Sequence, residues 1–172
     1  MKIISWNVNG LRAAWGHGLP TFIEKEQADI YAFQETKRYS PFRPAEVTGY
    51  LAYWSFNKEK KGYSGTLCLT KSLPLHVEYD MGDEAFDCEG RLITLEYPAF
   101  FFVNCYVPNS QSGNERHDYR TEWDMRFQQY VDGLLAKEPV IICGDFNVAI
   151  SDDDIYPENK WIDINSEGYM ST

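Results

Sequence analysis

The chain has 172 residues, of which 44% are hydrophobic and 16% aromatic. This composition excludes a disordered chain and fits one domain with a substantial core. No apolar run approaches the ~20 residues that a membrane-spanning helix needs, so we expect no membrane segment. The formal net charge of −10 argues against nucleic acid as a partner unless a local basic patch binds the phosphates.

The N-terminal residues, Met1 to Ser5, are typical of the start of a strand, and no signal peptide is visible. The chain has four cysteines, and no two of them have the spacing of metal ligands. Three lie inside apolar runs, which favours reduced core thiols and a cytoplasmic protein. The four are Cys68, Cys88, Cys105 and Cys143.

The apolar runs predict eight strands and only one long helix. Residues 119–135 place aromatic and aliphatic side chains on one helical face, which we interpret as core. A short helical turn is expected at 10–15, and a second helix at 22–27 with Thr21 as its N-cap and Glu24 at the capping-box position. The predicted strands are residues 3–6, 29–35, 50–56, 66–70, 75–79, 92–97, 100–107 and 140–143.

Four of these strands run directly into polar side chains. The 140–143 run, which reads as a strand buried on both faces, leads through Gly144 to Asp145 and Asn147. Residues two apart in extended backbone point the same way, so this carboxylate and amide can share one side. Similar endings follow the first, second and seventh strands, at Asn7 and Asn9, at Gln34 and Glu35, and at Asn104, Tyr106 and Asn109.

Each ending also has a simpler interpretation. Gly-Asp-x-Asn taken alone is most often a turn, because Gly, Asp and Asn are the commonest turn formers. The lysines at 58–61 are typical of a solvated face, although beside a phosphodiester site they could meet a nucleic-acid backbone. The aspartates at 152–154 lack the glycine and distal glutamate of a calcium loop, which favours a helix cap. Four polar endings together favour one shared polar site.

Six motifs in order resemble the exonuclease III family of apurinic/apyrimidinic endonucleases, within the endonuclease/exonuclease/phosphatase superfamily. They are Ile4-Ser5-Trp6-Asn7-Val8-Asn9-Gly10-Leu11-Arg12-Ala13, Gln34-Glu35-Thr36-Lys37, Gly62-Tyr63-Ser64-Gly65, Glu89-Gly90-Arg91, Tyr106-Val107-Pro108-Asn109 and Gly144-Asp145-Phe146-Asn147. The resemblance spans essentially the whole chain. It implies the DNase I-like fold, a four-layered α/β sandwich in which helices flank two packed sheets.

The resemblance also implies metal-dependent hydrolysis of a DNA phosphodiester on the 5′ side of an abasic site, in base-excision repair. Many members also have 3′-5′ exonuclease and 3′ phosphatase activity, so an abasic or 3′-blocked duplex is the expected partner. The expected cofactor is Mg²⁺ or Mn²⁺, because a hard cation prefers carboxylate oxygen and needs few protein carboxylates.

The implied site residues follow by position in the motifs. Glu35 resembles the metal ligand, supported by Asn7, and Asp145 resembles the general base or the residue that orients the attacking water. Asn147 would hydrogen-bond the phosphoryl oxygen and Tyr106 would contact the scissile phosphate. The metal-site residues are thus Asn7, Glu35, Asp145 and Asn147. The residues near the DNA are Arg12, Lys37, Tyr63, Arg91, Asn109 and Arg120.

The family pattern continues beyond the position of Thr172, with a second Asp-bearing motif, an aromatic stretch lining the abasic pocket, and a terminal Ser-Asp-His motif. His17, His76 and His117 match none of these. We therefore expect an incomplete sandwich with an uncovered apolar sheet face. A fragment, one half of a split enzyme, or a chain covered by self-association would each explain this pattern.

Two alternative functions remain. A phosphatase of the same fold would act on inositol phosphates or lipids, and a comparison of abasic DNA with phosphoinositides would separate it. A non-catalytic assembly module would use the uncovered face, and its mass in solution would identify it.

The sequence predicts that the isolated chain has little or no nuclease activity, because half of the catalytic constellation is missing and such residues act as a unit. The measurement is incision of an abasic duplex with Mg²⁺. Turnover near that of a full-length relative would refute this prediction.

Overall fold

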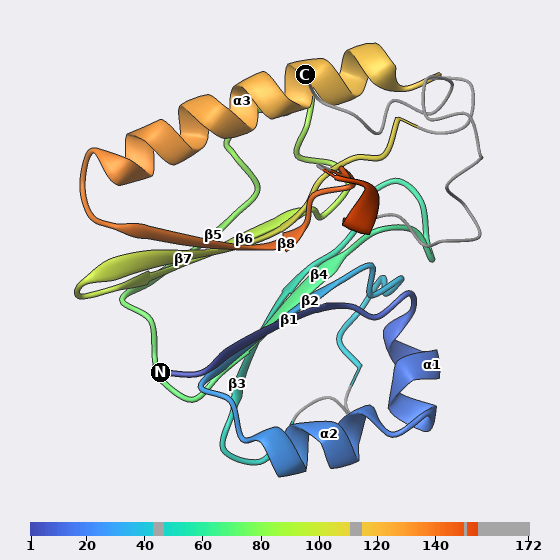
Figure 1. Cartoon of the computed structure of the whole chain (residues 1–172), viewed down its shortest axis with the longest axis vertical. Helices are drawn as coiled ribbons and strands as arrows, with labels where there is room; N and C mark the ends of the chain where they lie inside the picture. The colour runs from blue at the N-terminus through green and yellow to red at the C-terminus, as the bar shows by residue number, and fades with distance from the viewer. Residues whose placement is uncertain (43–46, 111–114, 150, 155–172) are drawn as a thin grey trace.

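The computed structural model describes residues 1–42, 47–110, 115–149 and 151–154, and in these ranges it forms four layers. In Figure 1 the long helix α3 lies over one sheet, a second sheet lies beneath, and α1 and α2 cover the far side. The predicted four-layered α/β sandwich is confirmed. Its elements are β1 (Ile3–Asn7), α1 (Leu11–Gly16), α2 (Leu19–Glu26), β2 (Ile30–Gln34), β3 (Leu51–Ser55), β4 (Thr66–Thr70), β5 (His76–Tyr79), β6 (Leu92–Tyr97), β7 (Phe100–Tyr106), α3 (His117–Leu135), β8 (Val140–Asp145) and the 3₁₀ turn η2 (Asp152–Asp154).

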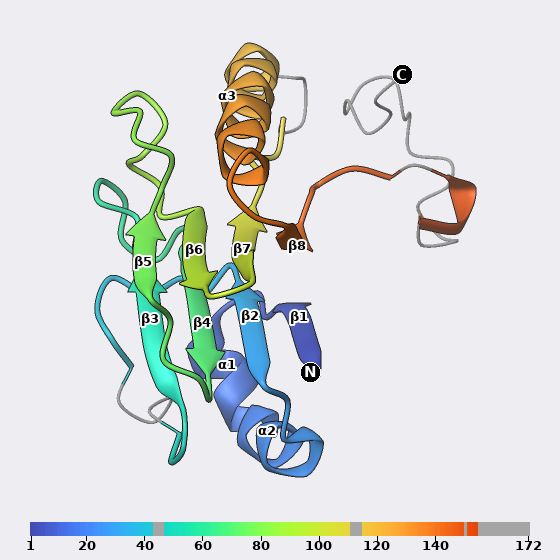
Figure 2. The same ribbon diagram turned by 90° about the vertical axis from the view of Figure 1, so that its left-hand side faces the viewer.

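Each sheet has four strands among the described residues. The first has the order β1-β2-β4-β3 and the second β5-β6-β7-β8. Within each sheet one neighbouring pair is parallel, β1 with β2 and β7 with β8, and the other pairs are antiparallel. Figure 2 shows β1 and β8 on the same side of the two stacked sheets. The parallel pairs therefore bring the carboxyl ends of β1, β2, β7 and β8 to neighbouring positions.

Three apolar layers hold the sandwich together. Between the sheets, Ala32 and Cys68 of the first sheet pack with Leu95 and Phe102 of the second. Beneath α1 and α2, Tyr31 and other β2 and β4 side chains face the helices, while Trp123 of α3 packs on the outer face of the second sheet. Burial on both faces explains why β2 and β4 read as continuous apolar runs.

The helices agree with the sequence pattern in kind but differ in detail. α2 begins at Leu19 after Gly18 and has Pro20 in its first turn, so the prediction that Thr21 caps it was wrong. α3 buries Trp123 and Val131 as predicted, whereas Leu135 at its end is exposed. No helix in the described ranges has both the length and the apolar character to span a membrane.

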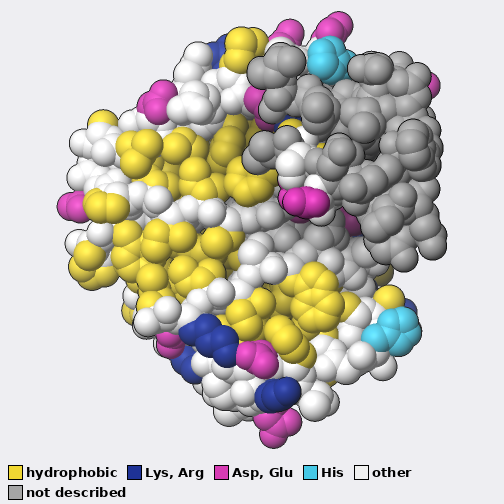
Figure 3. Space-filling model, in the orientation of Figure 1, with side chains coloured by type: hydrophobic (Ala, Val, Ile, Leu, Met, Phe, Trp, Pro, Cys, Tyr) yellow, Lys and Arg dark blue, Asp and Glu magenta, His cyan; other side chains and the backbone are white. Residues whose placement is uncertain are grey.

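The strand β8 corrects two expectations. It was predicted to be buried on both faces, yet all six of its residues are half-buried, because it is an edge strand with one neighbour among the described residues. The second expectation was an uncovered apolar sheet face. The uncovered surface is instead the edge formed by β1 and β8, since each sheet face meets either helices or the other sheet. Figure 3 shows hydrophobic side chains gathered on this side, and Trp6 and Phe146 are among the exposed aromatics.

Gly144 lies inside β8 and lets that strand pair closely with β7. A β-carbon built at Gly144 would lie 1.9 Å from the carbonyl oxygen of Cys105, its register partner. No larger residue fits without moving the strand. The predicted strand ended at residue 143, just before this glycine. The glycine instead allows the strand to continue to Asp145.

A buried pair of amide side chains joins the two sheets. Gln34 Nε2 of β2 donates to Asn104 Oδ1 of β7 over 2.8 Å. Asn104 Nδ2 in turn donates to the carbonyl oxygens of Phe33 (3.2 Å) and Leu67 (3.1 Å). Both amides are almost fully buried. Because buried polar groups without partners are costly, this pair admits one relative position of β2 and β7.

Asn104→Leu is expected to lower the free energy of unfolding by about 1–3 kcal/mol, because it removes the shared bond and leaves Gln34 and two carbonyls less well paired. Urea unfolding followed by tryptophan fluorescence measures the change. The control is Gln128→Leu on the exposed face of α3, where a shift within about 0.5 kcal/mol is expected. Equal effects of both substitutions would contradict a special role for the pair.

Candidate active site at the strand ends

The last residues of β1 and β8 contact each other directly. Asn7 Nδ2 donates to Asp145 Oδ2 over 2.6 Å, which joins the two sheets at their open edge. Asn7 Oδ1 also accepts the backbone N–H of Asn9. The amide of Asn7 is thus oriented by a turn on one side and by a carboxylate on the other.

The Asp145 carboxylate is fixed at both oxygens. Oδ2 accepts from Asn7, and Oδ1 accepts the backbone N–H of Asn147 over 2.9 Å. Asn147 has a left-handed backbone (φ 47°), which asparagine tolerates better than most residues. Its side-chain Nδ2 donates to the carbonyl oxygen of Val107 over 2.8 Å. The Gly-Asp-x-Asn segment is therefore a turn, and the turn itself orients the carboxylate.

Glu35 follows β2 immediately and also has a left-handed backbone (φ 54°). Its Oε1 lies 3.2 Å from Lys37 Nζ. Lys37 Nζ also donates to Asn9 Oδ1 over 2.5 Å. The backbone N–H of Gly10 donates to the Glu35 carbonyl oxygen. These contacts link the ends of β1 and β2 and leave the Glu35 carboxylate partly exposed, with a side-chain exposure of 23%.

Tyr106, the last residue of β7, lies close enough to Glu35 and Asp145 for both carboxylates to affect the pKa of its hydroxyl. Burial raises the pKa of its hydroxyl to about 12, and the negative charge of Glu35 adds to the rise. The positive charge of Arg91 opposes the rise, while Asp145 adds to it. The phenol is therefore protonated and neutral at neutral pH, and it can donate a hydrogen bond.

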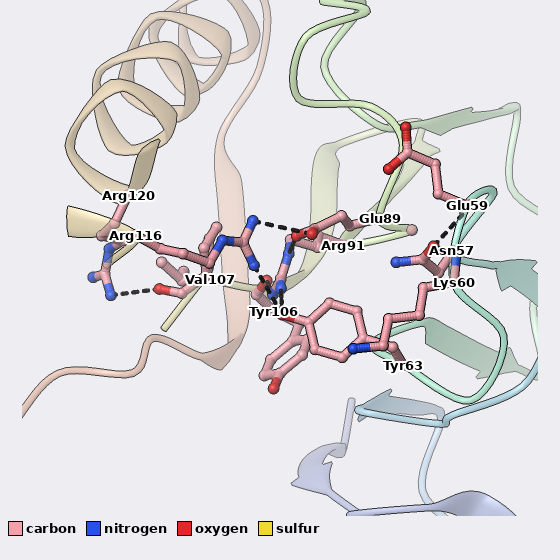
Figure 4. A network of polar contacts seen from close by, with 12 residues as sticks. Asn57, Glu59, Lys60, Tyr63, Glu89, Arg91, Tyr106, Val107, Arg116 and Arg120 are labelled. Carbon is pink, nitrogen blue, oxygen red and sulfur yellow. Dashed lines mark hydrogen bonds and ion pairs between the residues drawn. The ribbon is translucent and has the colours of Figure 1, made fainter. Parts of the chain in front are cut away.

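Arg91 lies against Tyr106 (Figure 4). Its guanidinium lies 4.6 Å from the centre of the Tyr106 ring, and Nη1 donates to the Tyr106 carbonyl oxygen over 2.9 Å. Nε pairs with Glu89 Oε2 over 2.7 Å, and Nη2 donates to the hydroxyl of Tyr63 over 3.2 Å. Only 2% of Arg91 is exposed, so every polar group of this arginine is used inside the protein.

A second arginine completes the network. Arg116 Nη1 donates to the Tyr63 hydroxyl over 2.8 Å, and Nη2 pairs with Glu89 Oε1 over 3.0 Å. Burial alone would raise the pKa of Glu89, but its two arginine partners lower the pKa overall. Glu89 is therefore an ionised bridge between Arg91 and Arg116.

The other predicted DNA-binding residues either lie near the strand ends or support the turn that follows β8. Arg12 is exposed and lines a pocket with Lys37 beside the strand ends, and Asn109 is half-buried just beyond Tyr106. Arg120 donates to the carbonyl oxygens of Pro108, Phe146 and Asn147 and pairs with Asp124, so it anchors the turn that carries Asn147.

Sequence reasoning did not assign roles to several supporting residues. Gln34 and Asn104 were among the predicted polar strand endings, but the sequence did not indicate that they bond to each other. Glu89 lay inside a quoted motif. Arg116 precedes the predicted helix and carried no signal of its own, because only the folded chain places it beside Glu89.

The donor chemistry fits a hard divalent cation held by few protein ligands. Within the described ranges, no three His, Cys, Asp or Glu side chains form a cluster that could hold a metal ion. Both Asp145 oxygens already accept hydrogen bonds. Glu35 is the carboxylate with an accessible oxygen. Mg²⁺ is commonly bound through one or two carboxylates plus water and phosphate, so the residues present are compatible with it.

The two stacked sheets between helix layers, with carboxylate, amide and phenol groups meeting at strand ends, define the endonuclease/exonuclease/phosphatase class of proteins. The model of the Endonuclease/Exonuclease/phosphatase family matches residues 4–161. The chain therefore belongs to this family and is related to hydrolases.

Among curated proteins, the chain is 46% identical over 159 residues to DNA repair nuclease APEX1 of Danio rerio, covering 90% of the chain and 51% of the relative. It is 43% identical over 170 residues to an exodeoxyribonuclease of Bacillus subtilis, covering 98% and 66%. Among solved structures, an AP endonuclease from Archaeoglobus fulgidus has a TM-score of 0.80 at 25% identity and covers 99% of this chain and 65% of that one.

These relatives support the predicted membership of the exonuclease III and AP endonuclease group. The chain spans about half to two thirds of their length. Its matched part contains all six motifs on which the resemblance was based.

Arg91→Lys is expected to lower the free energy of unfolding by roughly 1–3 kcal/mol, because a lysine cannot bind Glu89, Tyr63 and the Tyr106 carbonyl in the same fork. The matched control is Arg126→Lys, whose exposed guanidinium pairs with Asp83 and where little change is expected. Urea unfolding of both variants gives the comparison. Equal stabilities would mean that the buried network contributes nothing specific.

Proposed function

We propose that this chain carries the metal-binding and water-orienting part of a DNA phosphodiester hydrolase of base-excision repair, which incises 5′ to abasic sites and has 3′-5′ exonuclease and 3′ phosphatase activity. The observation that carries the proposal is the meeting of Asn7, Glu35, Tyr106 and Asp145 at the carboxyl ends of four strands. The names of its relatives, a DNA repair nuclease and an exodeoxyribonuclease, favour DNA over other phosphate esters.

Glu35 would be the main ligand of a Mg²⁺ or Mn²⁺ ion, with the oxygens of Asn7, Asp145 and Asn147 close to its water shell. When bound, such an ion polarises a phosphoryl oxygen and neutralises charge that develops during hydrolysis. The ion pair with Lys37 holds the Glu35 side chain in place before any cation arrives.

Asp145 would orient the attacking water and accept its proton. Two hydrogen bonds, from Asn7 and from the Asn147 backbone, hold the carboxylate in one orientation. A base fixed in this way loses little entropy when water binds, which is the advantage of preorganisation. Asn147 would contact the phosphoryl oxygen once DNA replaces its present bond to Val107.

Tyr106 would donate a hydrogen bond to the phosphate. Its pKa of about 12 keeps the phenol protonated at neutral pH, and Arg91 fixes the position of the ring. Tyr63, Arg91, Asn109, Arg12, Lys37 and Arg120 would line the DNA path or support it, with Arg120 acting through the Phe146–Asn147 turn.

Two alternative functions predict different results in binding and association experiments. A phosphatase of inositol phosphates or lipids would bind those headgroups better than DNA. A non-catalytic module would instead use the open edge of β1 and β8, either with a second copy or with a polypeptide that adds strands there. The four free cysteines agree with a reducing compartment such as the cytoplasm.

The DNA assignment is tested by anisotropy with a fluorescent abasic duplex in Mg²⁺, with the intact duplex and an inositol phosphate as competitors. The abasic duplex is expected to bind most tightly. Preferential binding of the inositol phosphate would favour the phosphatase, and no binding of any ligand together with a dimeric mass would favour the assembly module.

Mg²⁺ is expected to stabilise the folded chain, and Glu35→Gln is expected to abolish most of this effect. At tenfold excess over its dissociation constant, the ion would raise the melting temperature by about 3–6 °C. The control is Glu24→Gln on the exposed face of α2, which should keep the wild-type response. A Glu35→Gln protein that responds to Mg²⁺ as the wild type does would exclude Glu35 as the ligand.

A further inference from the structure

A basic pocket adjoins the candidate site, and its wall includes residues outside the proposed catalytic set. The pocket has a volume of about 590 Å³ and is lined by Asn9, Gly10, Arg12, Ala13, Thr36, Lys37 and Arg38. Asn9 and Lys37 belong to the strand-end site as well, because Lys37 bridges Asn9 and Glu35. A strand whose phosphate lies at Glu35 would therefore pass directly over this pocket.

Arg38 lies in this wall against two aromatic rings, and it has no carboxylate partner among the described residues. Its guanidinium lies 5.1 Å from the ring centre of Phe42 and 5.6 Å from that of Tyr39. Its Nε is buried and has no hydrogen-bond partner within the described part of the chain. The Arg38 guanidinium is thus positioned by aromatic rings, and no carboxylate of the described residues neutralises it.

The same wall contains a second unpaired group. The hydroxyl of Thr36 is fully buried and has no hydrogen-bond partner among the described residues. A β-carbon at Gly65 would lie 2.6 Å from this hydroxyl, so Gly65 is needed for the loop to pass so close. Two orphan polar groups thus occur in one basic wall.

A second cation also lies near the ring of Tyr39. Lys61 Nζ lies 5.3 Å from the Tyr39 ring centre, and the ring itself is 57% exposed. Among the ion pairs of the described residues, none involves Arg12, Arg38 or Lys61. In a chain with 26 acidic and 16 basic residues, three cations without carboxylate partners near one pocket form a local basic patch.

We propose that Arg38 and Lys61, which both lie near the ring of Tyr39, form a contact site for the backbone phosphates of the DNA strand that leaves the strand-end site. This inference rests on the proposed DNA function and adds residues that the six motifs do not contain. The aromatic rings reduce the entropy that Arg38 loses on binding, and Tyr39 offers an apolar face for a sugar or base. Lys61, one of the lysines at 58–61 that alone resemble a solvated face, thereby gains a partner.

The test is the salt dependence of binding to the abasic duplex, measured by anisotropy between about 50 and 300 mM salt. Each lost phosphate contact lowers the slope of log K against log salt by about 0.9. We expect Arg38→Gln and Lys61→Gln each to lower the slope by this amount and to weaken binding roughly fivefold to tenfold at 100 mM salt. Arg38→Lys keeps the charge and is expected to keep most of the slope.

The matched control is Lys71→Gln. Lys71 also stands over a tyrosine, 5.6 Å from the Tyr50 ring centre. It follows the carboxyl end of β4, which pairs with the start of β2, so it lies away from the site. For Lys71→Gln, the slope of log K against log salt should equal that of the wild type. Thermal unfolding of each variant verifies that the fold is retained.

The outcomes separate the two proposals. If the wild type binds no DNA, the proposed function fails, and the contact site fails with it. If the wild type binds and both Gln variants keep its slope, the DNA function stands and Arg38 and Lys61 are excluded as phosphate contacts. The same exclusion follows if Lys71→Gln lowers the slope as much as they do, because only net charge would then matter.

Discussion

The buried hydrogen bond between Gln34 and Asn104 fixes the relative position of the two sheets directly behind the candidate site. Gln34 precedes Glu35, and Asn104 lies two residues before Tyr106, so the pair sets the spacing between the ends of β2 and β7. Apolar packing between the sheets supplies most of the stabilisation but tolerates small shifts. Directional bonds between buried amides do not tolerate them, because any shift leaves a donor unpaired.

A second directional contact acts at the open edge. Asn7 and Asp145 end the two edge strands, and their 2.6 Å bond ties β1 to β8 where neither strand has an outer neighbour among the described residues. The catalytic candidates therefore lie on a line across the ends of both sheets. Asn7 and Asp145 are at its open side, and Tyr106 and Arg91 are further inside.

Charge is distributed unevenly along this line. Glu35 and Asp145 make the site itself acidic, whereas the buried Arg91 and the half-buried Arg116 flank Glu89 next to Tyr106. Beyond Glu35, the cations Arg12 and Lys61 are exposed and Arg38 is half-buried. This arrangement reconciles a net charge of −10 with the proposed DNA substrate, because a cation at Glu35 and the flanking arginines would meet the phosphates locally.

The sequence alone determined the type and order of the strands, the long helix and the polar endings of four strands, because side-chain periodicity and short motifs are local properties. It misplaced the start of α2 and the burial of β8, since an apolar strand reads the same at the centre and at the edge of a sheet. Only the tertiary structure placed Arg116 beside Glu89 and Lys61 beside the ring of Tyr39. Those neighbours depend on how loops from separate strands pack together, and no spacing along the chain records that packing.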